Sequence, residues 1–178
     1  DNLLAGDEAT EYLYQLGHRK IAYLGVDNSL VFSADRRNGY QLALTRHGIV
    51  PKPEYCVELP SITAGEDTPV HALLRSASRP TAIVVSDDIL ALTLERICTE
   101  TGLSIPADLS ILSFNNSLFA RLTSPQLTSI DINSCQLGIE AAAQMISHIE
   151  NPELPATKIL VPHQLIERDS CARPVSHS

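Results

Sequence analysis

The chain has 178 residues and a net charge of −8, with 44% hydrophobic residues and 13 Lys and Arg scattered along it. A chain of this length and hydrophobicity buries a substantial core, which excludes wholesale disorder, and it lacks the clustered basic footprint of a nucleic-acid-binding surface. No apolar run approaches the roughly 18 residues of a membrane span, and the first residues do not resemble a signal peptide.

The four cysteines, Cys56, Cys98, Cys135 and Cys171, are far apart and form no CxxC pair, and the six histidines lack HExxH or HxH spacing. These spacings disfavour a metal site and favour free thiols in a reducing compartment. We therefore expect a cytoplasmic protein with no metal and no cofactor.

Helical and strand-like segments alternate along the chain, with glycines ending two of the helices. In chain order, the residue patterns predict a helix over 7–17, a strand over 20–26, a helix over 34–49, a strand over 54–60, a helix over 68–77, a strand over 81–86, a helix over 87–102, strands over 109–114 and 127–132, a helix over 135–150 and an extended segment over 157–168.

This alternation predicts an α/β fold in which a parallel sheet is covered by helices on both faces. Ligands of such sheets bind at the carboxyl ends of the strands. Polar residues follow four of the predicted strands, at Asp27, 86–88, 115–117 and 131–134. The sequence therefore predicts a doubly wound sheet with one polar rim.

Arg36 and Arg37 are predicted to lie in the first turn of the helix over 34–49, where the helix dipole disfavours cations. Arg36 offers bidentate donors, Asp87 and Asn115 offer acceptors, and Phe114 offers an apolar face, a combination that suits a polyhydroxylated ligand. A surface ion pair for Arg36, a turn for Asn115 and core packing for Phe114 are the structural alternatives.

An enzyme is a second interpretation, because the adjacent carboxylates Asp87 and Asp88 follow a predicted strand and suit Mg²⁺. The chain has no GxxxxGK[ST], GxGxxG or GxSxG motif to accompany them. Helix capping is the commoner role for such residues, so the sequence favours a binding protein.

Six stretches resemble motifs of the LacI/GalR family of bacterial transcription regulators, in the family's order and almost from end to end. They are "DNLLAGDEATEYLYQLGHRKIAYLG", "ADRRNGY", "RPTAIVVSDDILALTL", "IPADLSILSFNNS", "SPQLTSIDINSCQLG" and "HQLIERDS". The second of these looks like the family's R-x-x-G-[FYW] element, and the last looks like its closing LI.R.S.

The resemblance implies a periplasmic-binding-protein-like (type I) core of two lobes, with this chain dominated by the C-terminal lobe. Residues 1–16 would end the N-terminal lobe, 17–129 would form the C-terminal lobe, and 130–152 would be a crossover helix returning to the N-terminal lobe. Residues 153–178 would provide closing strands of the C-terminal lobe and a tail.

The resemblance also implies effector-binding positions in the cleft between the lobes. These are Arg36, Asp87, Phe114, Asn115 and Ser134, with Asp88 as a capping or orienting residue. Arg37 has no such role in the family and is expected to face solvent or to lie on the lobe surface. Many sugar- and purine-binding relatives have an Asp where this chain has Asn115, which argues against a simple galactoside or a purine.

The stretches "SFNNS" and "LTSIDIN" look most like the maltose-operon repressors of Gram-positive bacteria, so a maltose-type sugar is the expected effector. The expected partners are this sugar, operator DNA bound through a headpiece that this chain does not contain, and a second copy in a homodimer, with no membrane. A secreted sugar-binding protein of an uptake system is the main alternative to this repressor.

Overall fold

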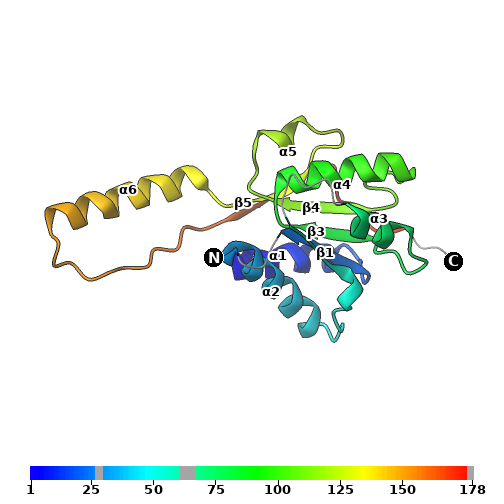
Figure 1. Ribbon diagram of the computed structural model, residues 1–178, viewed down its shortest axis with the longest axis horizontal. Coiled ribbons are helices and arrows are strands. Elements are labelled where there is room, and N and C mark those ends of the chain that lie inside the picture. The colour runs from blue at the N-terminus through cyan, green and yellow to red at the C-terminus, as the bar shows by residue number, and fades with distance from the viewer. Residues whose placement is uncertain (27–29, 61–66, 176–178) are drawn as a thin grey trace.

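The computed structural model describes residues 1–26, 30–60 and 67–175, and these form one six-stranded sheet in the order β2-β1-β3-β4-β5-β6 (Figure 1). The first five strands are parallel, and β6 runs antiparallel to β5. The sheet confirms the α/β class and the parallel pairing that the alternating sequence pattern predicts.

The helices and strands follow one another along the chain in near-regular alternation. They are α1 (Asn2–Gln15), β1 (Ile21–Val26), α2 (Val31–Arg46), a 3-10 turn (Pro53–Tyr55), β2 (Cys56–Leu59), α3 (Thr68–Arg75), β3 (Ala82–Val85), α4 (Asp88–Thr101), β4 (Ser110–Phe114), α5 (Leu118–Leu122), β5 (Thr128–Asp131), α6 (Ser134–Glu150) and β6 (Gln164–Ile166).

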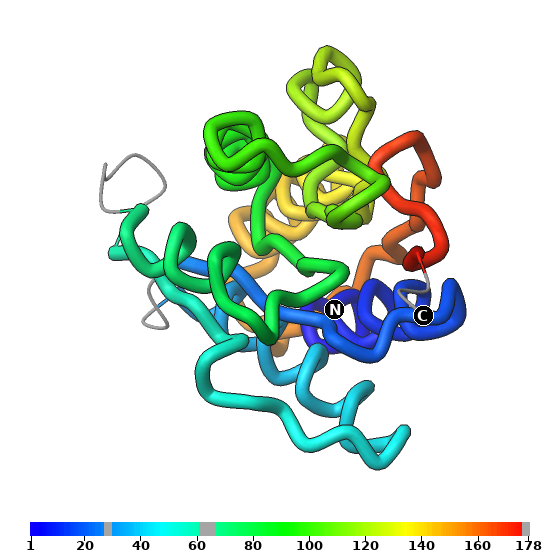
Figure 2. Tube along the Cα trace, turned by 90° about the vertical axis from the view of Figure 1, so that its right-hand side faces the viewer, coloured from blue at the N-terminus to red at the C-terminus, as the bar shows by residue number. Residues whose placement is uncertain are grey.

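The two faces of the sheet bury separate apolar clusters, because successive side chains of a strand point to opposite faces. Ala22 and Leu24 of β1 pack with α3, α4 and α5, whereas Ile21 and Tyr23 pack with α1 and α2. Figure 2 shows the sheet between these two layers of helices. Burial on both sides explains why β1, β3 and β4 are continuous apolar or small-residue runs.

Differences from the predicted elements lie mainly at their ends. The helix that carries Arg36 begins at Val31, three residues earlier than predicted, so Arg36 lies in its second turn and not in its first. Only three residues of the predicted extended segment 157–168 pair in the sheet, as β6. The short helix α5 has no counterpart among the predicted elements.

Helices α1 and α2 cross in very close contact, which two glycines make possible. A Cβ atom on Gly6 would overlap the Arg36 carbonyl oxygen, and one on Gly39 would overlap the Leu3 carbonyl oxygen. Through this crossing α1 covers the same sheet as α2. Residues 1–16 therefore pack against the same sheet as residues 17–129.

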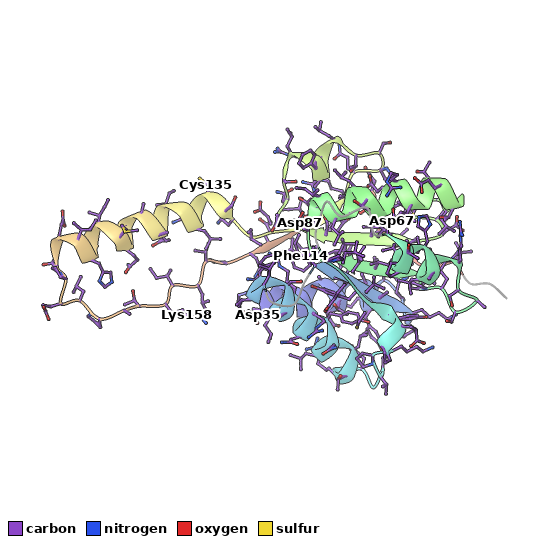
Figure 3. The ribbon with its side chains drawn as sticks, viewed as in Figure 1. Asp35, Asp67, Asp87, Phe114, Cys135 and Lys158 are labelled. Carbon is purple, nitrogen blue, oxygen red and sulfur yellow. The ribbon has the colours of Figure 1, made fainter. Side chains whose placement is uncertain are left out.

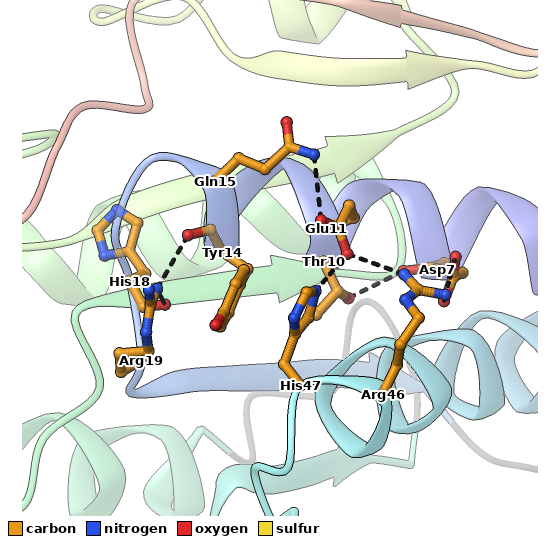
Figure 4. A network of polar contacts seen from close by, with 10 residues as sticks. Asp7, Thr10, Glu11, Tyr14, Gln15, His18, Arg19, Arg46 and His47 are labelled. Carbon is orange, nitrogen blue, oxygen red and sulfur yellow. Dashed lines mark hydrogen bonds and ion pairs between the residues drawn. The ribbon is translucent and has the colours of Figure 1, made fainter.

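A polar network on the outer side of this helix pair adds to the crossing (Figure 4). Arg46 bonds both Asp7 and Glu11, at 2.9 and 2.8 Å, and His47 also contacts Glu11, at 2.7 Å. These bonds from Arg46 and His47 lower the pKa of Glu11 to about 2. The network ties the end of α2 to the middle of α1.

Helix α6 is unlike the other long helices because it contains no buried residue. It projects from the body of the sheet, and the chain returns alongside it, as the labelled Cys135 and Lys158 show (Figure 3). Several of its large apolar side chains are exposed: Leu137, Ile139, Met145, Ile146 and Ile149.

Two general expectations can be checked on the structure. All four cysteines are free. In the part of the chain that the structure describes, no helix has the length and apolar character needed to cross a lipid bilayer.

Candidate functional site

Arg36 lies at the carboxyl edge of the sheet, where three separate parts of the chain hold its guanidinium. Its Nε donates to Asn2 Oδ1 at 3.0 Å, and its Nη1 donates to the Ser86 carbonyl oxygen at 2.6 Å. Its Nη2 donates to Asn115 Oδ1 at 3.3 Å. An arginine has five N–H donors, so one N–H on each terminal nitrogen has no partner among the described residues and can serve a ligand.

Two aromatic rings flank the same guanidinium. Its central carbon lies 4.4 Å from the ring centroid of Phe114 and 5.2 Å from that of Phe32. Arg36 is only 3% exposed, and this burial lowers the pKa of its guanidinium to about 10. The group is still a cation at neutral pH, and the rings fix its plane for bidentate hydrogen bonding.

Asp87 has both a helix-capping role and a place beside the arginine. One of its oxygens accepts from the Ile89 backbone N–H at 2.7 Å, which makes Asp87 the N-cap of α4. Its other oxygen accepts from Asn115 Nδ2 at 2.6 Å. Burial, and secondarily the neighbouring Asp88 carboxylate, raise the pKa of Asp87.

Asp88 is fully buried and serves as an internal anchor. Its Oδ1 accepts from the hydroxyls of Ser113 and Ser129, at 2.5 and 2.9 Å, and its Oδ2 accepts from the Ser117 N–H at 2.6 Å. These bonds fix Asp88 between β4, β5 and the turn that precedes α5. The capping of α4 belongs to Asp87.

The turn at Asn115 and Asn116 joins this site to the strand that leads into α6. Both residues have positive φ, 94° and 47°, which asparagine tolerates better than most residues. Asn116 Nδ2 donates to Asp131 at 2.9 Å, and Asn116 Oδ1 accepts from Arg168 at 2.5 Å. The turn is thereby held from both β5 and the closing segment.

A cavity of about 460 Å³ opens in front of Arg36. Its polar lining includes Asn2, Arg36, Asp87 and Asn115, and its apolar lining includes Phe32 and side chains from the segment that follows α6. A few convergent polar groups in a largely apolar concavity of this size are typical of a small-molecule site.

The structure brings together most, but not all, of the predicted site residues. Arg36, Asp87 and Asn115 line the cavity. Phe114 is fully buried behind the guanidinium and faces the core, which was one of its two predicted placements. Ser134 is exposed at the first turn of α6 and is not among the lining residues, and Asp27 lies outside the described residues.

Arg37 is half-buried and does not simply face solvent. Its Nη1 pairs with Glu58 of β2 at 2.9 Å. Consecutive residues of a helix point in different directions, so Arg37 cannot share the contacts of Arg36. The two neighbouring arginines therefore have separate roles.

The sequence analysis missed two residues of the site, Asn2 and Phe32. Phe32 precedes Arg36 by four positions, which places both on one face of α2, and this spacing is a signal that could have identified it. Asn2 has no comparable local signal, because only the crossing of α1 over α2 brings it to Arg36.

The carboxylates suit hydrogen bonding better than metal ligation here. Both oxygens of Asp87 and of Asp88 accept protein hydrogen bonds. Among the described residues, no group of three or more His, Cys, Asp or Glu side chains is placed to hold a metal ion.

The sheet and the site define the class of protein. The profile of the periplasmic binding protein-like domain family matches residues 10–171, so the chain belongs to this family. Its relatives are LacI-family regulators, which confirms the resemblance found in the motifs.

Three similar proteins illustrate this kinship. The probable HTH-type transcriptional repressor ExuR of Bacillus subtilis is 30% identical over 97% of this chain. A LacI transcriptional regulator from Bacillus cereus subsp. cytotoxis superposes with a TM-score of 0.91, at 37% identity over 97% of this chain and 61% of its own. A LacI family regulator from Enterococcus faecium with bound ribose superposes with a TM-score of 0.85, at 30% identity over 97% of this chain and 64% of its own.

The chain spans about half the length of the curated relatives it matches, 53% in the case of ExuR. These relatives are named as repressors and not as enzymes, which agrees at the family level with the expectation of a regulator.

Proposed function

We propose that this chain is the effector-binding and dimerisation part of a cytoplasmic, ligand-responsive transcriptional repressor, and that the cavity at Arg36 binds its effector. The observation that carries this proposal is the guanidinium of Arg36, which three chain segments orient while one N–H on each terminal nitrogen is left over. Such a fixed, desolvated fork binds oxygen acceptors strongly.

The effector that fits best is a neutral sugar, with a maltose-type disaccharide as the first choice. The charge of Arg36 has a counter-ion in Asp87, which favours an uncharged ligand over an anion. Asn115 is already fixed as acceptor to Arg36 and donor to Asp87, and the second lone pair of its carbonyl oxygen can accept from a ligand hydroxyl. A volume of about 460 Å³ is ample for a sugar.

The exposed apolar face of α6 fits the crossover helix of a two-lobed protein, and we propose that a preceding lobe covers it. Met145 and Ile149 are 66% and 71% exposed, and burying a side chain of this kind stabilises by about 1.5–3 kcal/mol. An Ile146→Asp variant should therefore lower the melting temperature of the intact protein while leaving that of the 178-residue chain unchanged.

Homodimerisation and operator binding complete the proposal. Leu118, Phe119 and Leu122 of α5 are exposed and offer an apolar surface for a second copy. A bound sugar would favour the form of the protein in which the two lobes close around it. The coupling free energy between such a sugar site and the DNA-binding site is typically about 1–3 kcal/mol. Selecting from a random DNA pool the sequences that the intact protein binds should recover palindromic sites. If no sequence is recovered, the secreted sugar-binding protein of an uptake system is favoured instead.

The direct test is calorimetry on the intact protein with maltose, maltotriose, ribose, galactosides and purines. Arg36→Gln should weaken binding of the active compound about 100-fold, the equivalent of about 3 kcal/mol for charge-assisted bonds. Arg37→Gln, on the same helix but outside the cavity, is the matched control and should bind normally. Binding that is indifferent to Arg36 would refute the assignment of the cavity.

A further inference from the structure

A second pocket lies at the opposite, amino edge of the sheet. It has a volume of about 290 Å³ and is formed where the chain enters β1, β3 and β4, together with the end of α3 and the C-terminal segment. The four-residue strand β3 alone spans roughly 13 Å, so this pocket is separate from the cavity at Arg36.

Three cations line this pocket: Lys20, Arg75 and Arg79. Within the described part of the chain, none of the three has an ion pair or a hydrogen bond from its charged group. Arg37, Arg46 and Arg96 are different, because each pairs with a carboxylate at 2.9 Å or less. The chain as a whole has 21 acidic residues for 13 Lys and Arg, so the gathering of three cations in one pocket is a local excess of positive charge.

The pleat of the sheet directs these groups to the same side. The Thr81 N–H donates to the Lys20 carbonyl oxygen at 2.8 Å, so the two residues are neighbours at the starts of adjacent strands. Lys20 is in phase with Ala22 and Leu24, which face α3 and α4. Arg75 is in the last turn of α3, and Arg79 follows on the way into β3.

The pocket contains little to offset this positive charge. Its one acidic lining residue, Asp108, accepts from the Ser104 N–H at 2.9 Å. His18 is 1% exposed and lies between Thr81 Oγ1 and the Ala172 carbonyl oxygen, at 2.8 and 2.9 Å, and burial lowers its pKa, which favours the neutral ring. The negative end of the α3 helix dipole stabilises one of these cations, Arg75. No comparable local feature accounts for the positive charges of Lys20 and Arg79.

We propose that this pocket binds a small phosphate monoester, independently of the effector cavity. A dianionic phosphate presents three oxygens to cations, and the forks of two arginines match that geometry. The apolar lining residues Leu74, Pro106 and Pro174 would contact the carbon skeleton. The small volume suits a phosphorylated compound of a few carbons.

Inorganic phosphate is the probe for the test, titrated into the intact protein with chloride adjusted to hold ionic strength constant. We expect saturable binding of about one phosphate per chain, with the amide signals of residues 76–79 and 81 shifting in a ¹⁵N NMR spectrum. Arg79→Gln and Lys20→Gln should each weaken binding at least tenfold. Removing one of several like charges should leave the melting temperature without phosphate unchanged or slightly higher, which a structural role for these cations would not do.

Arg121→Gln is the matched control, because Arg121 is an exposed arginine in the last turn of α5. It should bind phosphate as the wild type does. The proposal is overturned if phosphate does not saturate, if Arg79→Gln and Lys20→Gln bind as tightly as the wild type, or if Arg121→Gln weakens binding equally. If one of the pocket variants fails to fold, the other still decides the result.

Discussion

At the carboxyl edge of the sheet the side chains of Arg36, Asp87 and Asp88 each have at least two hydrogen-bonding partners, whereas at the amino edge the charged groups of Lys20, Arg75 and Arg79 have none within the described residues. The same strands connect the two edges. The difference shows that the charged groups of one edge are held by bonds within the protein, and that those of the other edge are left without protein partners.

This difference has energetic consequences. Groups at the carboxyl edge are desolvated, so removing one partner leaves another buried and unsatisfied, which is costly. Groups at the amino edge keep their hydration, so removing one changes stability little. The four predictions that follow test this contrast, starting with the largest expected effect.

Asp88→Ala should destabilise the protein by about 3 kcal/mol, because the hydroxyls of Ser113 and Ser129 and the Ser117 N–H lose a charged acceptor. Urea unfolding measures the change. Asp169→Ala, which removes an exposed carboxylate, is the control and should stay within about 0.5 kcal/mol of the wild type. A loss below 1 kcal/mol for Asp88→Ala would contradict an organising role for this anchor.

Gly39→Ala should destabilise by about 2 kcal/mol, since its Cβ would overlap α1 and push Asn2 away from Arg36. Gly138→Ala is the matched control, because no atom lies within 4 Å of a Cβ added there in α6. That change should stabilise by up to about 1 kcal/mol through helix propensity. Thermal unfolding measures the stability of both variants. Equal changes in stability would argue against the close crossing of α1 and α2 at Gly39.

Glu95→Gln should stabilise the protein at pH 8 by about 1 kcal/mol and have no effect near pH 4. Glu95 Oε1 is buried and has no hydrogen-bond partner among the residues that the structure describes, and burial raises the pKa of this carboxyl from 4.5 to about 7. The native state holds this proton more tightly than the unfolded state does, so stability falls as pH rises between these two values.

Unfolding free energies measured from pH 4 to 8 test this prediction for Glu95. Glu153→Gln, which changes an exposed glutamate, should show no pH-dependent difference from the wild type. A gain for Glu95→Gln that is constant across the range would show that titration is not its cause.

Arg79→Gln should raise stability at low salt by about 0.5 kcal/mol, because it relieves repulsion among the amino-edge cations. The gain should vanish at about 1 M NaCl, where the screening length is roughly 3 Å. Melting temperatures at several salt concentrations measure it. A clear loss of stability would show that Arg79 has a structural partner.

Much of the fold is predictable from local sequence. Apolar strands such as "KIAYLGV" and "TAIVVS", separated by helical spacing, indicate a parallel sheet, and the sheet in turn places Arg36, Asp87 and Asn115 at one edge. The resemblance of six stretches to known motifs indicated the family. The first turn of α2 was missed because it starts at Val31 without a capping side chain to mark it.

The sequence by itself determined the alternation of elements, the polar rim and the family, because hydrophobic periodicity and turn residues act over a few positions. Only the tertiary structure decided that Asn2 and Ser86 hold Arg36, that Phe114 turns to the core, and that Lys20, Arg75 and Arg79 share a pocket. These contacts join residues far apart along the chain, and they depend on helix crossings and strand register that no local pattern specifies.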